Sequence, residues 1–167
     1  MPELSDPHFR QTLVFLHDHG ADGSLGLILN RPVGKCLSDL LNEAELPELL
    51  RDTPIFYGGP VQPEQVLLAL FTLDAAGVLR CELKPSADHI CEARRDPRAW
   101  LRAFVGYAGW SGGQLEDELQ RQDWRLDRPD PALFDARFCT RLWPLYALGD
   151  PRWHSLVPHL PREPDLN

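Results

Sequence analysis

The chain of 167 residues has a mass of 19.0 kDa, and its 17 basic and 25 acidic residues give a formal net charge of −8. This length predicts a single domain, which we place at residues 1–158 with a frayed tail at 159–167. The acidic balance disfavours direct nucleic-acid binding, and no apolar run approaches the roughly 18 residues of a membrane span. The first residues lack the basic and apolar segments of a secretory signal, so we expect a cytoplasmic protein with no membrane contact.

The first third of the sequence predicts a β-hairpin followed by a helix. Residues 10–17 and 24–30 are rich in leucine, β-branched and aromatic side chains, and the Asp- and Gly-containing stretch between them favours a reversal. Pro32 is expected to end the second strand because proline cannot donate a hydrogen bond to a strand ladder. Apolar residues at helical spacing then predict a helix over 37–50, with a break at Pro47.

The middle of the sequence predicts three strands and a helix. We expect strands at 54–61 and at 64–73, where a near-continuous apolar run predicts burial on both faces. Alternation over 78–84 predicts a strand with one solvated face. Ser86 can then cap a helix over 87–93.

The last third is predicted to contain both strands and helices. The second half of 99–110 should be extended, and a helix follows at 114–121. Residues 123–129 are predicted to be extended, 131–135 to form a helical turn, and 139–149 to form a helix. Hairpins rather than regular βαβ units favour an α+β class: a single domain with a mainly antiparallel, curled, small barrel-like sheet and flanking helices.

A glycine-rich stretch at 106–113 precedes the helix at 114–121 and is a candidate phosphate-binding loop. Backbone N–H groups and the positive end of a helix dipole attract anions at such a place. However, Glu116, Asp117 and Glu118 fall at the start of the helix and would repel a phosphate. The spacing also lacks the P-loop and dinucleotide-binding motifs. We therefore expect these glycines to allow close backbone approach instead.

Cysteine, serine and arginine residues do not predict a site. The four cysteines are Cys36, Cys81, Cys91 and Cys139. They lack zinc-finger spacing, so we expect free thiols and no structural metal. Ser111 lies outside a nucleophile-elbow motif, and no residue is singled out as catalytic. Four arginines lie around Trp100: Arg94, Arg95, Arg98 and Arg102. Acidic neighbours dilute this run, and we interpret it as a solvated face.

Four segments stand out together by their order and spacing. They are residues 1–34, which end in NRPVG, FYGGPV at 56–61, GYAGWSGGQLEDEL at 106–119, and LFD followed by LW and LG within 133–149. Together they resemble the YqgE/AlgH family of bacterial proteins over nearly the full length. The resemblance implies a compact α+β fold with a small barrel-like sheet. It implies no established enzymatic activity, and we expect no cofactor; one branch of the family carries the label of a regulator of alginate synthesis genes.

The sequence departs from the family pattern at two places. Relatives usually have a further apolar strand before Met1, and its absence would either expose a sheet edge or reflect an alternative start codon. Many relatives carry a cysteine where this chain has His17, so a thiol-based role fails there. His17 and His19 are two apart and would share one face of a strand, where they could ligate a metal with His8 or His89. A metal-assisted hydrolase is therefore one alternative, although polar residues at a hairpin end are the simpler interpretation.

The NRP motif at 30–32 has two interpretations. Arg31 could clamp a carboxylate or phosphate through its planar fork. Alternatively, Asn30 and Arg31 bond to backbone carbonyls of the GGP and GYAGW segments, and we favour this structural role because buried polar groups must be paired.

These motifs are expected to converge and to form a binding surface for an unknown protein or small-molecule partner. Its candidate residues are Asn30, Arg31, Pro32, Gly58, Gly59, Pro60, Tyr107, Gly109, Trp110 and Gln114. Tyr107 and Trp110 would fill the adjacent core or line a shallow cleft. A transcriptional regulator that contacts DNA is the second alternative function.

Overall fold

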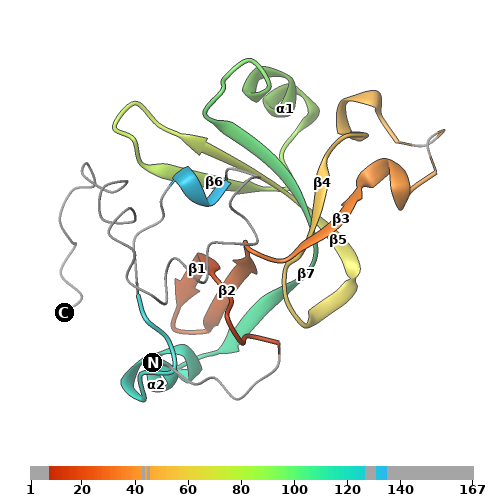
Figure 1. Cartoon of the computed structure of the whole chain (residues 1–167). Helices are drawn as coiled ribbons and strands as arrows, with labels where there is room; N and C mark the ends of the chain where they lie inside the picture. Colours follow the sequence, from red (N-terminus) through yellow and green to blue (C-terminus); the bar gives the residue numbers. More distant parts are fainter. Residues whose placement is uncertain (1–7, 43, 45, 127–130, 135–167) are drawn as a thin grey trace.

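The computed structural model describes residues 8–42, 44, 46–126 and 131–134 (Figure 1). The seven strands within these ranges are β1 (Val14–Gly20), β2 (Gly23–Ile28), β3 (Pro32–Cys36), β4 (Pro54–Tyr57), β5 (Val61–Leu73), β6 (Leu79–Leu83) and β7 (Ala99–Ser111). The two α-helices there are α1 (Ala87–Ala93) and α2 (Gln114–Gln120), and 3-10 turns span Leu37–Asp39, Glu48–Leu50 and Pro131–Phe134. The described chain is mostly sheet with two helices, in line with the predicted α+β class.

Strand β7 lies at the centre of the sheet. It pairs antiparallel with β2 and β5 and parallel with β4, while β1, β3 and β6 extend the sheet beyond β2, β4 and β5. Five of the six pairings in the described ranges are antiparallel, as the sequence predicted. In this part of the chain the pairings end at β1, β3 and β6 and do not close into a ring, so the barrel-like curl stays a prediction.

The largest core cluster packs against β5 and β7. Phe71 and Phe104 are fully buried, and their ring centroids lie 6.3 Å apart. Each such side chain contributes on the order of 2 kcal/mol through removal of apolar surface from water. Burial of β5 is uneven: Leu67–Phe71 are buried or half-buried, whereas 62–66 are exposed beside an irregular register. The predicted burial on both faces therefore holds only for the second half of this strand.

The two α-helices lie where the sequence predicted them, at opposite ends of the molecule (Figure 1). The Ser86 side chain accepts a hydrogen bond from the His89 backbone N–H (3.2 Å), so the predicted cap of α1 is confirmed. Helix α2 begins after Gly113, whose φ is 79°, and Glu116 and Asp117 lie in its first turn. These carboxylates occupy the positive end of the helix, which supports the argument against a phosphate there.

The helix predicted over 37–50 is wrong. The described residues of this range form two separate 3-10 turns. The Asp39 carboxylate accepts a hydrogen bond from the Cys36 backbone N–H (2.8 Å), a capping contact that begins the first of these turns without extending it into a helix. Leu40 and Leu41, which the pattern assigned to the core face, are 49% and 45% exposed.

The sequence pattern also missed strand β3. The preceding strand already ends at Ile28, and Pro32 begins β3 instead of ending β2. Proline is tolerated as the first residue of a strand because its missing N–H is not needed by the ladder there. β3 pairs with β4 through Pro32 opposite Phe56 and Cys36 opposite Pro54, with an irregularity between them.

Several predictions fall partly or wholly outside the described residues. The turn predicted at 131–135 is confirmed by the 3-10 turn Pro131–Phe134, whereas 123–126 form no strand. The helix at 139–149 and the tail at 159–167 lie outside the described ranges.

Among the helices that are described, none has the length and apolar character needed to cross a membrane.

Candidate functional site

Asn30 binds main-chain groups of the segment that leads into β1. The residue is 8% exposed, and its side-chain oxygen accepts a hydrogen bond from the Leu13 N–H (2.9 Å). Its amide nitrogen donates to the Gln11 carbonyl (2.9 Å). A nearly buried amide needs such partners. This supports the predicted structural role, but the predicted partners, the GGP and GYAGW carbonyls, are wrong.

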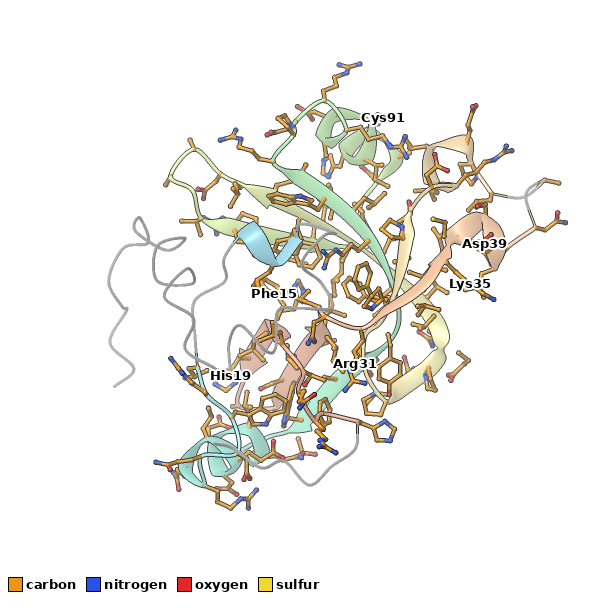
Figure 2. All side chains as sticks on the ribbon, in the orientation of Figure 1. Phe15, His19, Arg31, Lys35, Asp39 and Cys91 are labelled. Carbon is orange, nitrogen blue, oxygen red and sulfur yellow. The ribbon has the colours of Figure 1, made fainter. Side chains whose placement is uncertain are left out.

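Arg31 also binds main chain. Its Nη2 donates to the Arg10 carbonyl (2.6 Å), and its own carbonyl accepts a hydrogen bond from the Tyr57 N–H (2.8 Å). Figure 2 shows Arg31 beside the start of β3. The guanidinium therefore joins the chain before β1 to the chain between β2 and β3.

The segment that these two side chains hold is a turn, which we call the N-terminal turn (residues 8–12). The backbone N–H and the hydroxyl of Thr12 both donate to the Phe9 carbonyl, at 3.3 and 2.9 Å. Gln11 has a φ of 56°, in the left-handed region that residues other than glycine seldom adopt. The predicted strand at 10–17 therefore begins only at Val14.

Aromatic contacts fix the first two residues of the N-terminal turn. The His8 ring stacks on Tyr57 with a centroid distance of 6.5 Å, and its Nδ1 lies 3.1 Å from the Tyr57 hydroxyl. Phe9 stacks on Trp110 at 6.1 Å and meets Trp124 edge-on at 5.5 Å. The N-terminal turn thus covers Trp110, which belongs to the predicted binding surface.

The glycines of the GGP and GYAGW motifs bring two main chains into direct contact. A Cβ on Gly58 would lie 2.2 Å from the Gly106 carbonyl oxygen, and one on Gly59 would lie 2.2 Å from the Tyr107 main chain. Gly106 has a φ of 68°, which glycine adopts without a steric penalty. The close backbone approach predicted for this region is confirmed, although GYAGW lies within strand β7 and is not a loop.

The other glycines and prolines of the predicted surface differ in their surroundings. A Cβ on Gly112 would lie 2.3 Å from the Ala21 carbonyl oxygen, as expected for close approach. At Gly109 the nearest atom would be 3.4 Å away, an ordinary contact, so close approach was wrongly expected there. Pro32 is exposed, whereas Pro60 is half-buried.

Glu118 on α2 joins Trp110 to the helix and was not assigned to the surface from the sequence. One carboxylate oxygen accepts hydrogen bonds from the indole N–H groups of Trp110 (2.8 Å) and Trp124 (2.7 Å). The other accepts one from the Gln114 amide (2.9 Å), and the Gln114 oxygen accepts one from the Ser111 N–H (3.1 Å). Gln114 and Glu118, one helical turn apart, therefore lie on one face of α2. That spacing is the signal in the sequence, whereas the two indoles come from separate segments.

The two histidines of the metal alternative do not share a site. A register irregularity between Leu16 and Asp18 includes His17, so the simple alternation that placed it beside His19 is broken. The His19 ring instead has its Nδ1 2.7 Å from the Ser24 hydroxyl and its Nε2 3.6 Å from a Glu116 carboxylate oxygen. Figure 2 shows His19 at the end of the hairpin near α2. Within the described residues no group of three potential ligands is placed to hold a metal.

The arginine run near Trp100 is not one solvated face. Arg102 is 3% exposed, with its guanidinium 4.2 Å from the Phe56 ring centroid and 4.9 Å from that of Phe134. It donates hydrogen bonds to the carbonyls of Leu29 (3.3 Å) and Leu133 (3.2 Å). Arg102 therefore ties the 3-10 turn at 131–134 to the sheet, and its assignment to the surface was wrong because it alternates inward on β7.

Ionisable groups with shifted pKa values lie on β6 and α1, outside the motifs. Hydrogen bonding to the Glu82 carboxylate raises the pKa of the exposed His89, whose Nδ1 lies 3.0 Å from either oxygen. Burial raises the pKa of the Cys81 thiol to about 12, so it stays protonated at neutral pH. Cys36, Cys81 and Cys91 are free thiols, as predicted, and Cys139 lies outside the described residues.

Comparisons with known proteins agree with the motifs. A family model described as AlgH-like matches residues 1–147. The chain is 39% identical over 158 residues to a UPF0301 protein of Stutzerimonas stutzeri, covering 85% of this chain and 80% of the relative. It is 41% identical over 153 residues to a UPF0301 protein of Methylococcus capsulatus, covering 86% and 81%.

Two solved structures share the fold. The solution structure of the AlgH protein from Pseudomonas aeruginosa matches with a TM-score of 0.62 at 28% identity, over 98% of this chain and 92% of that one. A crystal structure of a Corynebacterium diphtheriae protein matches with a TM-score of 0.55 at 17% identity, over 81% and 75%.

Proposed function

Because this chain belongs to the AlgH-like family, we propose that it is a non-catalytic cytoplasmic protein with a regulatory role, which binds a partner protein or a small ligand. The binding surface is formed by the NRP, GGPV and GYAGW motifs. The two relatives described above carry the name UPF0301 protein, which states no activity, so support for this role comes from the residues themselves.

One observation carries the proposal: the polar side chains of the motifs bind the protein's own groups. Asn30 and Arg31 hold the main chain of the N-terminal turn, and the Trp110 indole donates to Glu118. Such contacts build a rigid frame, and a pre-formed surface loses less conformational entropy when it binds. Pro32 and Gln114 are exposed on this frame, while Arg31 and Tyr107 are half-buried, which leaves them within reach of a partner.

A binding experiment with a matched control tests this proposal. The purified chain is used in a thermal-shift screen against metabolites and as bait in a pull-down from bacterial lysate. Arg31→Ala should lower the affinity for a ligand or a captured partner by at least about fivefold, which corresponds to the loss of one charge-assisted hydrogen bond. Lys35→Ala, on the exposed part of neighbouring β3, should leave binding unchanged. Binding that is equal in both variants, or turnover of a bound compound, would contradict the proposal.

One arrangement favours a hydrolytic alternative. Ser24, His19 and Glu116 follow one another in the order hydroxyl, imidazole, carboxylate, which resembles an activated serine nucleophile. The side chains of His19 and Glu116 are 40% and 46% exposed, and their separation of 3.6 Å is longer than a hydrogen bond. We therefore expect no labelling of Ser24 by a fluorophosphonate probe. Labelling that His19→Ala abolishes would establish the alternative.

Direct DNA contact is the other alternative, and the arrangement of arginines gives it little support. Arg102 is buried, Arg98 pairs with Asp96 (3.3 Å), and Arg94 donates to the Leu49 carbonyl. The net charge of −8 also opposes a polyanion. A mobility-shift assay at moderate salt should show free DNA only, and a retarded band would favour the regulator that contacts DNA.

A further inference from the structure

We propose that the N-terminal turn (residues 8–12) occupies the partner-binding site in cis, and that the partner presents a turn of the same chemistry: an aromatic residue followed by main-chain carbonyls. This inference rests on the proposed binding function and identifies the kind of protein segment that the site would take. It also assigns the turn an autoinhibitory role.

The contacts to the turn are of a kind that a second chain could reproduce. Arg31 and Asn30 donate to the carbonyls of Arg10 and Gln11, which any peptide possesses at those positions. Such contacts recognise backbone shape and are independent of side-chain identity. The groups that hold this turn in cis can therefore hold the same backbone arrangement in trans.

Specificity would come from the aromatic side chain. Phe9 packs against both Trp110 and Trp124, stacked on the first at 6.1 Å and edge-on to the second at 5.5 Å, and the two indoles also contact each other at 5.7 Å. Aromatic anchors of this kind dominate the energy of many protein interfaces. The two indole N–H groups donate to Glu118, which fixes both rings whichever chain supplies the aromatic residue that packs against them.

The N-terminal turn is also the part of this region that can dissociate from the site without disrupting the sheet. It precedes β1, so its removal breaks no strand pairing. His8, Arg10 and Gln11 are exposed, and Gln11 has the left-handed φ of 56°. Release of the turn would relieve that backbone strain. The Asn30 contact to the Leu13 N–H lies beyond the turn and can persist as a hinge.

A peptide titration of the full chain tests the inference. The probe is a capped peptide with the sequence of residues 8–13, HFRQTL, added to the ¹⁵N-labelled chain while the tryptophan indole N–H resonances are followed. The cis turn competes at an effective concentration on the order of millimolar. Phe9→Ala removes the aromatic anchor of this competitor and should tighten peptide binding by at least about tenfold.

Two further variants separate binding from stability. In the Phe9→Ala background, Arg31→Ala should weaken peptide binding by about fivefold or more, whereas Lys35→Ala should leave it unchanged. Replacing the phenylalanine of the peptide by alanine should abolish measurable binding. If Phe9→Ala fails to fold, His8→Ala, which removes the Tyr57 contact, should still tighten binding about twofold. If Phe9→Ala, or His8→Ala in its place, folds and binds the peptide with the same affinity as the unmodified chain, the inference is overturned.

Failure of this inference can be told apart from failure of the proposed function. A partner captured by the unmodified chain, lost in Arg31→Ala but insensitive to Phe9→Ala, would overturn the autoinhibitory turn and leave the binding function standing. Peptide binding that follows the pattern above while no natural partner or ligand is found would support the inference and count against the proposed function.

Discussion

Glu118 provides a quantitative test of how the motifs are held together. Its carboxylate accepts hydrogen bonds from the indoles of Trp110 and Trp124 and from the Gln114 amide, at 2.7–2.9 Å. Hydrogen bonds to a charged group contribute about 1.5–3 kcal/mol each, and a buried donor left without a partner costs about 1–3 kcal/mol. Trp110 is only 7% exposed, so its N–H would lose its partner in Glu118→Ala.

The three bonds share one half-buried carboxylate, so their contributions are not additive. We expect Glu118→Ala to lower the free energy of unfolding by about 2–4 kcal/mol in total. For a chain of this size, each kcal/mol lowers the melting temperature by about 2–4 °C. Glu118→Gln keeps one acceptor oxygen and should lose about half as much.

Urea unfolding at pH 7, followed by tryptophan fluorescence, measures these differences. The indole N–H resonances of Trp110 and Trp124 should move upfield in Glu118→Ala because their acceptor is gone. A free energy of unfolding within about 0.5 kcal/mol of the unmodified chain, as for an ordinary surface substitution, would refute this account of the cluster.

Three further expectations follow from the geometry. Gly58→Ala places a Cβ 2.2 Å from a carbonyl oxygen and should destabilise the fold by more than about 3 kcal/mol, whereas Gly20→Ala meets nothing within 4 Å and should stay within about 0.5 kcal/mol in urea unfolding. In an NMR titration the His89 ring should have a pKa above 6.5 that Glu82→Gln lowers again. Since the pKa of His89 is raised in the folded state, the stabilisation of the fold by the protonated ring is complete below pH 6.5 and is lost as the pH rises through the folded pKa. A titration midpoint of the His89 ring at or below 6.5 would contradict this expectation. Arg102→Lys loses the planar fork that spans two carbonyls and two rings, and should cost about 2–3 kcal/mol in thermal unfolding; an unchanged melting curve would contradict this.

Elements with strong local signals could be predicted from the sequence. The β1–β2 hairpin follows from two apolar runs around an Asp- and Gly-containing reversal, and α1 follows from the Ser86 cap. The range 37–50 misled because apolar spacing does not record which side chains face solvent, and the capping contact of Asp39 begins only a single 3-10 turn. β3 was missed because a strand with a proline at its start gives little periodic signal.

The candidate site could be predicted only in part. Close backbone approach was predicted correctly at Gly106 and Gly112 because it requires glycine, but the sequence did not show that Gly58 and Gly59 are the partners of the chain around Gly106. The partners of Asn30 and Arg31 were not, since the N-terminal turn lies about twenty residues away and polar contacts to main chain leave no sequence pattern. Glu118 was noted only as an acidic residue at the start of α2, because the two indoles that it binds come from separate segments.

The free energy of unfolding of Asn30→Ala tests most directly whether the NRP motif holds the main chain together. This substitution leaves the Leu13 N–H and the Gln11 carbonyl without their side-chain partner. We expect a loss of about 2 kcal/mol, because water can reach the exposed Gln11 but not fully replace the amide at half-buried Leu13. Asn42→Ala is the matched control and should stay within about 0.5 kcal/mol, because the long hydrogen bond that it removes, from the Ala44 N–H (3.3 Å), is exposed and water can replace it. Equal stability of the two variants would contradict the structural role assigned to the motif.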